Sequence, residues 1–475
     1  MENSRKSICN DLLERVADAF SADVPAGSSI VLGLSGGVDS VVLLHLLRQL
    51  SPRCSWRLSA LHVHHGISPQ ADVWAAFCAD LCEKENIPLK VVRVNIAPLR
   101  YLGIEAAART LRYAALARQP ADFIALAHHQ DDQAETLLLQ LLRGAGVRGV
   151  SAMPAIKQRE GAPVLLRPLL DVARSKLIDY AHKNSLQWVE DESNADDAYP
   201  RNFLRHQVLP LLEQRFPAYR TTLARSARHF SEASELLDDL ARQDARSIPL
   251  SPSGVTSDLA AIITQPDRMA GGFTRGGEGE PFIELTHLQA LSHPRAKNLL
   301  RYFITAQGAP LPDSALLEEM LHQVSTARRD AQLCITWKNW QIRRYRGHVY
   351  VLPGSFLPVD FSIIWRGEAE ILLPPPHGVL LFERAMGQGV SPEKLQPGAI
   401  EIHPRRGGEK LRQHVAGPQR TLTNLLQEKG IFPWLRDVLP LLFLRDELVC
   451  VPGVAVACVY QAQPGEMGVS VSWRL

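Results

Sequence analysis

Residues 35–40, SGGVDS, combine two adjacent glycines with two serines and one acid, between two apolar runs. Glycines after a strand let backbone N–H groups approach an anion, and the N-terminus of a following helix adds partial positive charge. A P-loop would place a lysine on the outer phosphates, and this segment has no lysine. Because an acid repels bare phosphates, the pattern predicts a Mg²⁺-bound nucleotide, with Asp39 on the metal and the phosphates held by Ser35, Gly36, Gly37, Val38 and Ser40.

A second acidic group, Asp131, Asp132 and Glu135, follows the segment AHH at 127–129. Spacings of three and four place Glu135 on one helical face with both aspartates. Taken alone, the trio has a simpler explanation, because acids in a first helical turn stabilise the helix by about 0.3–1 kcal/mol.

Five histidines, at 62, 64, 65, 128 and 129, suggest a metal site at first reading. We disfavour zinc because no matching thiolate and no recognised ligand spacing accompany them. Imidazoles that line a nucleotide pocket, with His62 as the candidate, or packed histidines fit the pattern better.

Short apolar runs alternate with helical patterns in the first part of the chain. We expect strands at 29–34, 57–65, 89–96 and 122–128, and helices at 39–50, 71–86, 104–119 and 131–143. This order predicts an α/β fold with a doubly wound parallel sheet, covered by helices on both faces. Ligands of such sheets bind at the carboxyl ends of the strands, so the glycine loop, the histidines and the acidic trio are expected on one rim.

With 475 residues the chain exceeds one ordinary core. We predict an N-terminal nucleotide-binding domain over 1–215, a helical middle domain with an aromatic β-meander over 216–355, and a small α+β C-terminal domain over 356–475. The aromatic residues of the meander either stack bases or form a small core, and we favour the core.

Charge and cysteine content restrict the class of protein further. The net charge is only +2, but residues 143–176 and 403–436 each carry seven Lys or Arg against two acids, which fits local contacts with phosphates. The seven cysteines include no CxxC pair and are read as reduced thiols. No segment approaches the roughly 18 apolar residues of a membrane helix, so a cytoplasmic protein without membrane contact is expected.

The motifs, taken together, resemble those of one family. The segment at 35–40 is similar to the PP-loop of the N-type ATP pyrophosphatases, which cleave ATP between the α and β phosphates. The order of further motifs resembles the tRNA(Ile)-lysidine synthases: HVHHG (62–66), IEAAARTLRY (104–113), AHHQDDQAETLLLQLLRGAG (127–146), RPLLDVAR (167–174), EDESNADDAYPRNFLRHQVLP (190–210), RRGGEKLR (405–412) and IFPWLRDVLPLLFLRDELVCVPG (431–453).

The resemblance implies ligation of free L-lysine to the wobble cytidine of an isoleucine tRNA with a CAU anticodon, through an adenylylated cytidine, at the expense of ATP and with Mg²⁺. It implies catalytic roles for Asp39, Asp131, Asp132 and Glu135, which would bind the amine of lysine or Mg²⁺, and a nucleotide contact for Arg112. The implied tRNA contacts are Arg201, Asn202, Arg205, Arg405, Arg406 and Arg436.

The chain departs from many relatives where Thr423 and Asn424 replace adjacent lysines, and where Ile67 and Ser68 follow HHG. Two alternatives stay open: a tRNA 2-thiolation enzyme on the same ATP-binding domain, against which the absence of CxxC speaks, and a noncatalytic ATP- or tRNA-binding protein. A homodimer is considered as one assembly.

Overall fold

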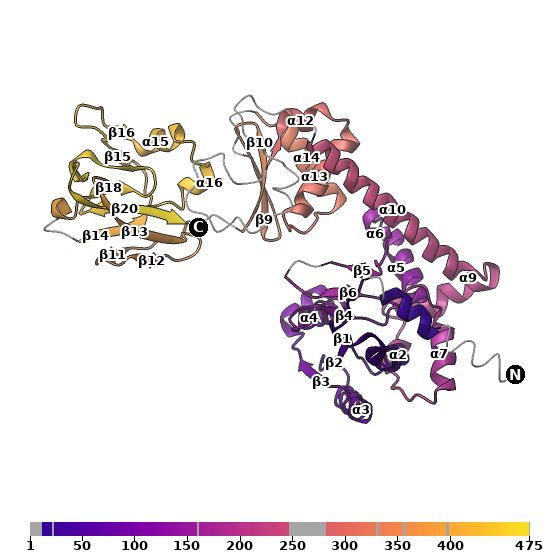
Figure 1. Cartoon of the computed structure of the whole chain (residues 1–475). Helices are drawn as coiled ribbons and strands as arrows, with labels where there is room; N and C mark the ends of the chain where they lie inside the picture. The colour runs from indigo at the N-terminus through magenta and orange to yellow at the C-terminus, as the bar shows by residue number, and fades with distance from the viewer. Residues whose placement is uncertain are drawn as a thin grey trace. The chain divides into compact units, whose positions relative to one another are not determined.

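The computed structural model describes residues 12–20, 23–158, 161–246, 282–328, 331, 333–354, 358–395 and 399–474. The chain divides into two units, Met1–Leu236 and Leu237–Leu475. Their elements are labelled along the chain in Figure 1. Among the described residues, no helix has both the length and the apolar composition to cross a membrane.

The first unit is built on a six-stranded sheet with the order β3-β2-β1-β4-β6-β5. All neighbouring pairs are parallel except β5 and β6, which are antiparallel. The strands are β1 (Ser29–Gly33), β2 (Arg57–His64), β3 (Leu89–Arg93), β4 (Phe123–Ala125), β5 (Ile156–Lys157) and β6 (Val164–Leu166). Because the chain runs outward from β1 in both directions, the crevice between β1 and β4 is the topological switch point, where such sheets bind ligands.

Helices cover both faces of this sheet. Alternate strand residues separate into two cores: Ile30 and Leu32 pack with buried residues of α2, α3 and α7, and Val31 packs with those of α4. The helices of the first unit are α2 (Val38–Cys54), α3 (Ala71–Lys84), α4 (Ile104–Ala117), α5 (Gln130–Leu142), α6 (Val147–Val150), α7 (Arg174–Lys183), α8 (Pro200–Phe203) and α9 (Leu209–Arg215), followed by α10 (Tyr219–Arg246).

The predicted doubly wound α/β fold is therefore confirmed. The expected strand at 89–96 ends at Arg93, since β3 is an edge strand with little burial. The short strands β5 and β6 were not predicted, because two or three residues carry no readable periodicity.

The second unit contains a four-stranded antiparallel sheet packed with three helices. The sheet order is β7-β10-β9-β8, from β7 (Ile283–Glu284), β8 (Cys334–Trp337), β9 (Trp340–Tyr345) and β10 (His348–Pro353). The helices are α12 (Leu285–Ala290), α13 (His293–Ala306) and α14 (Ser314–Thr326). The expected meander is confirmed, and Trp337 and Tyr350 are buried in cores, as favoured from the sequence.

The C-terminal part of the second unit has two larger antiparallel sheets around one core. One has the order β11-β14-β17-β18-β19 and the other β12-β13-β20. Their strands are β11 (Ile363–Trp365), β12 (Glu370–Leu372), β13 (Val379–Met386), β14 (Ile400–Pro404), β17 (Pro440–Leu444), β18 (Glu447–Val451), β19 (Ala455–Val456) and β20 (Met467–Arg474).

Small elements complete this part: the pair β15 (Lys410–Leu411) and β16 (Arg420–Thr421), and the helices α15 (Leu422–Glu428) and α16 (Pro433–Arg436). The α+β character expected for the C-terminal region is confirmed. The domain boundaries at 215/216 and 355/356 stay a prediction.

Candidate functional site

The loop between β1 and α2 is held in shape by the hydroxyl group of Ser40. Ser40 is buried, and its Oγ accepts hydrogen bonds from the backbone N–H groups of Ser35 and Gly36, at 3.2 Å in each case. The same hydroxyl donates to the carbonyl oxygen of Gly37 at 2.9 Å. Ser40 therefore shapes the loop from inside, and the hydrogen bond to phosphate predicted for it would require these partners to separate.

Gly36 fits a position that no other residue can occupy without strain. Its φ is +90°, and an added Cβ would lie 2.8 Å from Cγ2 of Val189 and 3.2 Å from Sγ of Cys78. The N–H of Val189 donates to the carbonyl oxygen of Gly36 at 3.0 Å. Gly37 has ordinary φ and caps α2, whose first residue, Val38, is buried. The glycines thus bring the loop backbone close to the segment that precedes residue 190.

His129 connects this loop to the loop that follows β4. Its side chain is 3% exposed, and Nε2 lies 3.5 Å from Oδ2 of Asp39 and 3.5 Å from Oδ2 of Asp132. Burial lowers the pKa of His129, but the charge of Asp132 and the hydrogen bond and charge of Asp39 more than offset this, so the pKa is raised. The two acids predicted for one rim are brought together here, across the switch point of the sheet.

Asp132 forms a capping box with His129 at the start of α5. The N–H of His129 donates to Oδ2 of Asp132 at 3.0 Å, and the N–H of Asp132 donates to Nδ1 of His129 at 3.4 Å. Burial raises the pKa of Asp132, but the charges of His129 and Arg201 oppose it and lower the value to about 2. Asp132 is therefore a permanent negative charge at neutral pH.

Glu135 is enclosed by two of the arginines that were predicted to contact tRNA. The carboxylate is 1% exposed, and its oxygens accept from Nε of Arg201 at 2.6 Å and from Nε of Arg205 at 2.7 Å. Arg205 adds a second bond through Nη2 at 3.0 Å. The structure thus pairs a predicted catalytic acid with two predicted substrate contacts.

Asp131 and Asn202 order the surrounding segments. Asp131 receives a hydrogen bond from Nε of Arg220 at 2.5 Å and one from the N–H of Arg174 at 3.0 Å. The buried amide of Asn202 donates to the carbonyl oxygen of Asp196 at 2.9 Å. Both carboxylate oxygens of Asp131 therefore already accept a hydrogen bond from Arg220 or Arg174.

His62 supports the glycine loop from behind. It is buried, its Nδ1 lies 2.9 Å from the carbonyl oxygen of Leu34 and 3.5 Å from Sγ of Cys78, and burial lowers its pKa. These contacts place His62 under the loop, so they favour a supporting role over the predicted contact with the nucleotide.

Arg112 lies among neutral imidazoles and other arginines. Burial, followed by the charge of Arg112, lowers the pKa of His65 to about 4. For His128, burial and then the charges of Arg167 and Arg112 lower the pKa to about 3, against the opposing charge of Asp132. Within the described part of the chain Arg112 forms no ion pair with a carboxylate; its guanidinium lies 5.9 Å from the ring centroid of Tyr113. Its positive charge is thus available to an anion.

The three C-terminal arginines have different environments. Arg406 is exposed, and Arg405 is half-buried, with Nη2 2.5 Å from Oγ1 of Thr423. Arg436 is 9% exposed, and its Nε donates to the carbonyl oxygen of Ile431 at 2.9 Å. Burial lowers the pKa of Arg436. These contacts favour a structural role for Arg436, and its predicted contact with tRNA stays a prediction.

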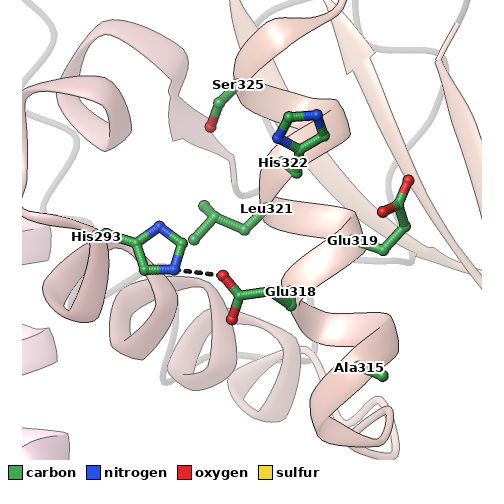
Figure 2. A pocket seen from close by; sticks show the side chains of 7 residues that line it. All are labelled: His293, Ala315, Glu318, Glu319, Leu321, His322 and Ser325. Carbon is green, nitrogen blue, oxygen red and sulfur yellow. Dashed lines mark ion pairs between the residues drawn. The ribbon is translucent and has the colours of Figure 1, made fainter.

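A cavity elsewhere is separate from this constellation. Figure 2 shows it beside α14 in the second unit, with a volume of about 530 Å³ and a lining that includes His293, Glu318, Glu319 and His322. The pairing of His293 with Glu318 is drawn there as an ion pair. Its two acids make it unsuited to phosphate, and it contains none of the predicted site residues.

The contribution of His129 was missed from the sequence. Its neighbours Asp131 and Asp132 were identified by their spacing, whereas a histidine before an acidic helix start reads equally well as packing. The sequence did contain a signal for this role. His129 directly precedes the first residue of a helix, and an acid, Asp132, follows three residues later, which is the spacing of a capping box.

Comparison with known proteins shows which family the chain resembles. The chain matches three family descriptions: "PP-loop domain" over residues 9–212, "TilS substrate binding domain" over 284–350, and "TilS substrate C-terminal domain" over 400–473. A tRNA(Ile)-lysidine synthase of Nitrosomonas europaea is 41% identical, covering 100% of this chain and 98% of that one. The enzyme of the same name from an Azoarcus species is 37% identical, covering 95% and 93%.

Among solved structures, a U34-tRNA thiolase from Methanococcus maripaludis matches 48% of this chain and 80% of its own, with 19% identity and a TM-score of 0.43. The relatives that match over the full length, together with the two acids joined across the switch point by His129, lead to one conclusion. The chain belongs to the tRNA(Ile)-lysidine synthase family.

Proposed function

We propose that the protein uses ATP to join free L-lysine to carbon 2 of the wobble cytidine of an isoleucine tRNA with a CAU anticodon, releasing AMP and pyrophosphate. One observation carries the proposal: Nε2 of His129 lies 3.5 Å from both Asp39 and Asp132, so a nucleotide loop and an acidic amine-binding group share one site. Full-length identity to enzymes of this name supports the same reaction.

ATP is assigned to the loop 35–40 at the start of α2. The backbone N–H groups and the helix N-terminus provide partial positive charge for phosphates. Oδ1 of Asp39 is buried and has no hydrogen-bond partner among the described residues, which fits a ligand of Mg²⁺. Mg²⁺ needs only one or two carboxylates when phosphates complete its coordination, so Asp39 alone suffices. When bound, the metal would offset phosphate charge.

The reaction requires two bond exchanges. The O2 atom of cytidine bonds to the α-phosphorus of ATP while pyrophosphate leaves with the electrons of the broken bond. The amine of lysine then bonds to C2, and AMP leaves with the oxygen. Because a lysine amine has an ordinary pKa of about 10.4, it must lose a proton before it attacks.

Asp132 is the acid that we assign to the amine. Its charge persists at neutral pH, since its pKa is about 2. Arg201 and Arg205 hold Glu135 at 2.6 and 2.7 Å, so its participation requires these arginines to release it. The same arginines lie 3.4 and 3.9 Å from Oδ1 of Asp132, so they hold Asp132 less tightly. Asp131 is engaged by Arg220 and the N–H of Arg174. Asp132 is also the acid that shares His129 with the nucleotide loop, which brings amine and phosphate close together.

The test uses purified protein with ATP, Mg²⁺, radiolabelled lysine, and a tRNA that carries either the isoleucine or the methionine CAU anticodon stem. Label in the isoleucine tRNA alone, with one pyrophosphate released per lysine, is the expected result. Without lysine, release should stop at one pyrophosphate per tRNA, since the adenylylated cytidine then has no amine to react with. Repeated turnover of ATP without lysine would favour a 2-thiolation enzyme, and nucleotide or tRNA binding without release would favour a noncatalytic protein. Asp39→Asn is the matched inactive control.

Two further attributes belong to this proposal. The proposed substrates are ATP, lysine and tRNA, which in bacteria are all present in the cytoplasm. We therefore propose a cytoplasmic location. A homodimer is the assembly to examine first, and sedimentation of the free protein and of its tRNA complex distinguishes one chain from two.

A further inference from the structure

The glycine loop has a charge problem that its own residues do not solve. ATP brings several negative charges to a place where Asp39 is already acidic, and the loop has no lysine for the outer phosphates. Mg²⁺ offsets only part of this charge. A second cation has to come from another element of the sheet's rim.

Arg174, the first residue of α7, lies where such a cation is needed. Its Nε is 3.9 Å from Oδ1 of Asp39, and its side chain is 43% exposed. Among the described residues, Arg174 is the arginine that forms an ion pair with a side chain of the loop. The contact is longer than a hydrogen bond, so the donors of the guanidinium are not consumed by Asp39.

The backbone of Arg174 is fixed at this rim by two hydrogen bonds. Its own N–H donates to Oδ2 of Asp131 at 3.0 Å, and the N–H of Gln130 donates to the carbonyl oxygen of Val172 at 2.9 Å. Both bonds tie the start of α7 to the start of α5. The main chain is therefore anchored while the side chain stays half-exposed, which is the arrangement expected of a ligand-binding arginine.

Neighbouring arginines are committed to carboxylates in a way that Arg174 is not. Arg201, Arg205 and Arg220 each donate to an acid at 2.5–2.7 Å. Oδ1 of Asp39, in contrast, is buried without a hydrogen bond. Oδ1 of Asp39 lies 3.9 Å from Nε of Arg174, in an ion pair without a hydrogen bond, so both groups keep hydrogen-bonding capacity for a ligand.

A simple surface ion pair is the competing explanation. Exposed pairs contribute about 0–1 kcal/mol and need no anchored backbone. A guanidinium matches two phosphate oxygens at once, which favours phosphate recognition beside a loop that opens a helix N-terminus.

We propose that Arg174 binds the β and γ phosphates of ATP and then the departing pyrophosphate, in place of the lysine that the loop lacks. This rests on the proposed cleavage of ATP between its α and β phosphates. As that bond breaks, its electron pair passes to the pyrophosphate, and the guanidinium stabilises the charge that accumulates there.

The test measures binding of ATP, AMP and inorganic pyrophosphate by calorimetry in the presence of Mg²⁺, without tRNA and without lysine. Arg174→Gln is expected to weaken the binding of ATP and of pyrophosphate about tenfold or more. The binding of AMP should weaken less than twofold, since AMP lacks the contacted phosphates. Arg174→Lys keeps the positive charge but loses the guanidinium that can bind two oxygens at once. Its affinity for ATP and pyrophosphate should lie between those of the wild type and Arg174→Gln. Lys176→Gln removes an equal charge from an exposed residue of the same helix and is the matched control.

Two results would overturn the assignment. If the substitution weakened the binding of AMP and ATP equally, Arg174 would only shape the loop. If the affinities for all three ligands were unchanged, Arg174 would form only a surface ion pair with Asp39. Because no tRNA or lysine is present, the outcome is separate from the lysidine assay. A wild-type protein that makes no lysidine but shows the predicted phosphate pattern would refute the reaction and retain the role of Arg174.

Discussion

His129 is the residue through which the two halves of the proposed chemistry meet. One ring nitrogen closes the cap of α5, and the other lies between Asp39 and Asp132. A single side chain therefore fixes the start of a helix and the distance between two acids. These two roles can be separated by substitution, since only one of them depends on the second nitrogen.

We expect His129→Ala and His129→Asn to differ in stability but not in activity. Asparagine is a good helix cap, so His129→Asn should regain most of the roughly 1 kcal/mol lost in His129→Ala. Neither variant has a group between Asp39 and Asp132, so both should lose at least tenfold in pyrophosphate release dependent on lysine and tRNA. Unfolding by urea and the release assay measure the two effects. Full activity of His129→Asn would show that His129 serves only as the N-cap of α5.

Asp132 should make stability depend on pH in the acid range. Its pKa is about 2 in the folded chain against an ordinary 3.8, so its contribution is present above about pH 4 and is lost as the pH falls through about 2. Between pH 5 and pH 3 the wild type should lose about 1 kcal/mol more than Asp132→Asn. Urea unfolding at both pH values tests this, with Asp179→Asn, an exposed aspartate, as control. Equal losses in wild type and Asp132→Asn would contradict it.

At the scale of elements, the β1–α2 connection is supported by segments distant in the sequence. Val189 binds Gly36 through its N–H, Cys78 of α3 lies against the position of an added Cβ, and His62 of β2 holds Leu34. The loop is thus packed on protein through Gly36 and Leu34, while its N–H groups at Ser35 and Gly36 are held by Oγ of Ser40.

The two glycines of the loop are therefore expected to respond differently to substitution. Gly36→Ala puts a methyl group 2.8 Å from Cγ2 of Val189 at a φ of +90°, so it should destabilise the protein by about 1–3 kcal/mol. Gly37→Ala meets nothing closer than Oγ of Ser35 at 3.6 Å and has ordinary φ, so it should fold normally. Thermal unfolding checks both. Equal melting temperatures for the two variants would show that the Val189 contact yields without cost.

At the scale of the whole molecule, the basic clusters divide into structural and exposed arginines. The cluster around 403–436 contains Arg406, which is exposed, and Arg436, which is buried against Ile431. Net charge near zero means that tRNA binding must depend on such selected positions rather than on the overall field.

Arg406→Gln should weaken tRNA binding and lower the slope of log affinity against log salt by about 0.7–0.9, the value for one phosphate contact. Arg436→Gln should leave that slope unchanged and instead lower stability, because a buried carbonyl group loses its donor. Filter binding at several salt concentrations, with unfolding measured in parallel, separates the two. If the salt slope changed in Arg436→Gln and not in Arg406→Gln, Arg436 would contact phosphate and Arg406 would not.

The resemblance of the motifs identified the family before the fold was known. The sequence also predicted the sheet with helices on both faces and the rim on which the glycine loop, the histidines and the acidic trio were expected. These follow from local signals: alternating apolar runs, paired glycines and acids at helical spacing. The predicted roles of individual side chains were less secure, because a motif letter such as Asp39 or His62 does not say which way its side chain faces.

The pairing of the charged groups is seen in the folded chain and could not be read from the sequence. The fold closed Glu135 with Arg201 and Arg205, placed His62 beneath the loop, and brought Arg174 to Asp39 from a different helix. Such contacts join residues far apart in the chain, and they depend on strand order and on the distance between helix starts. No local periodicity encodes those quantities, so they appear only when the sheet has been assembled.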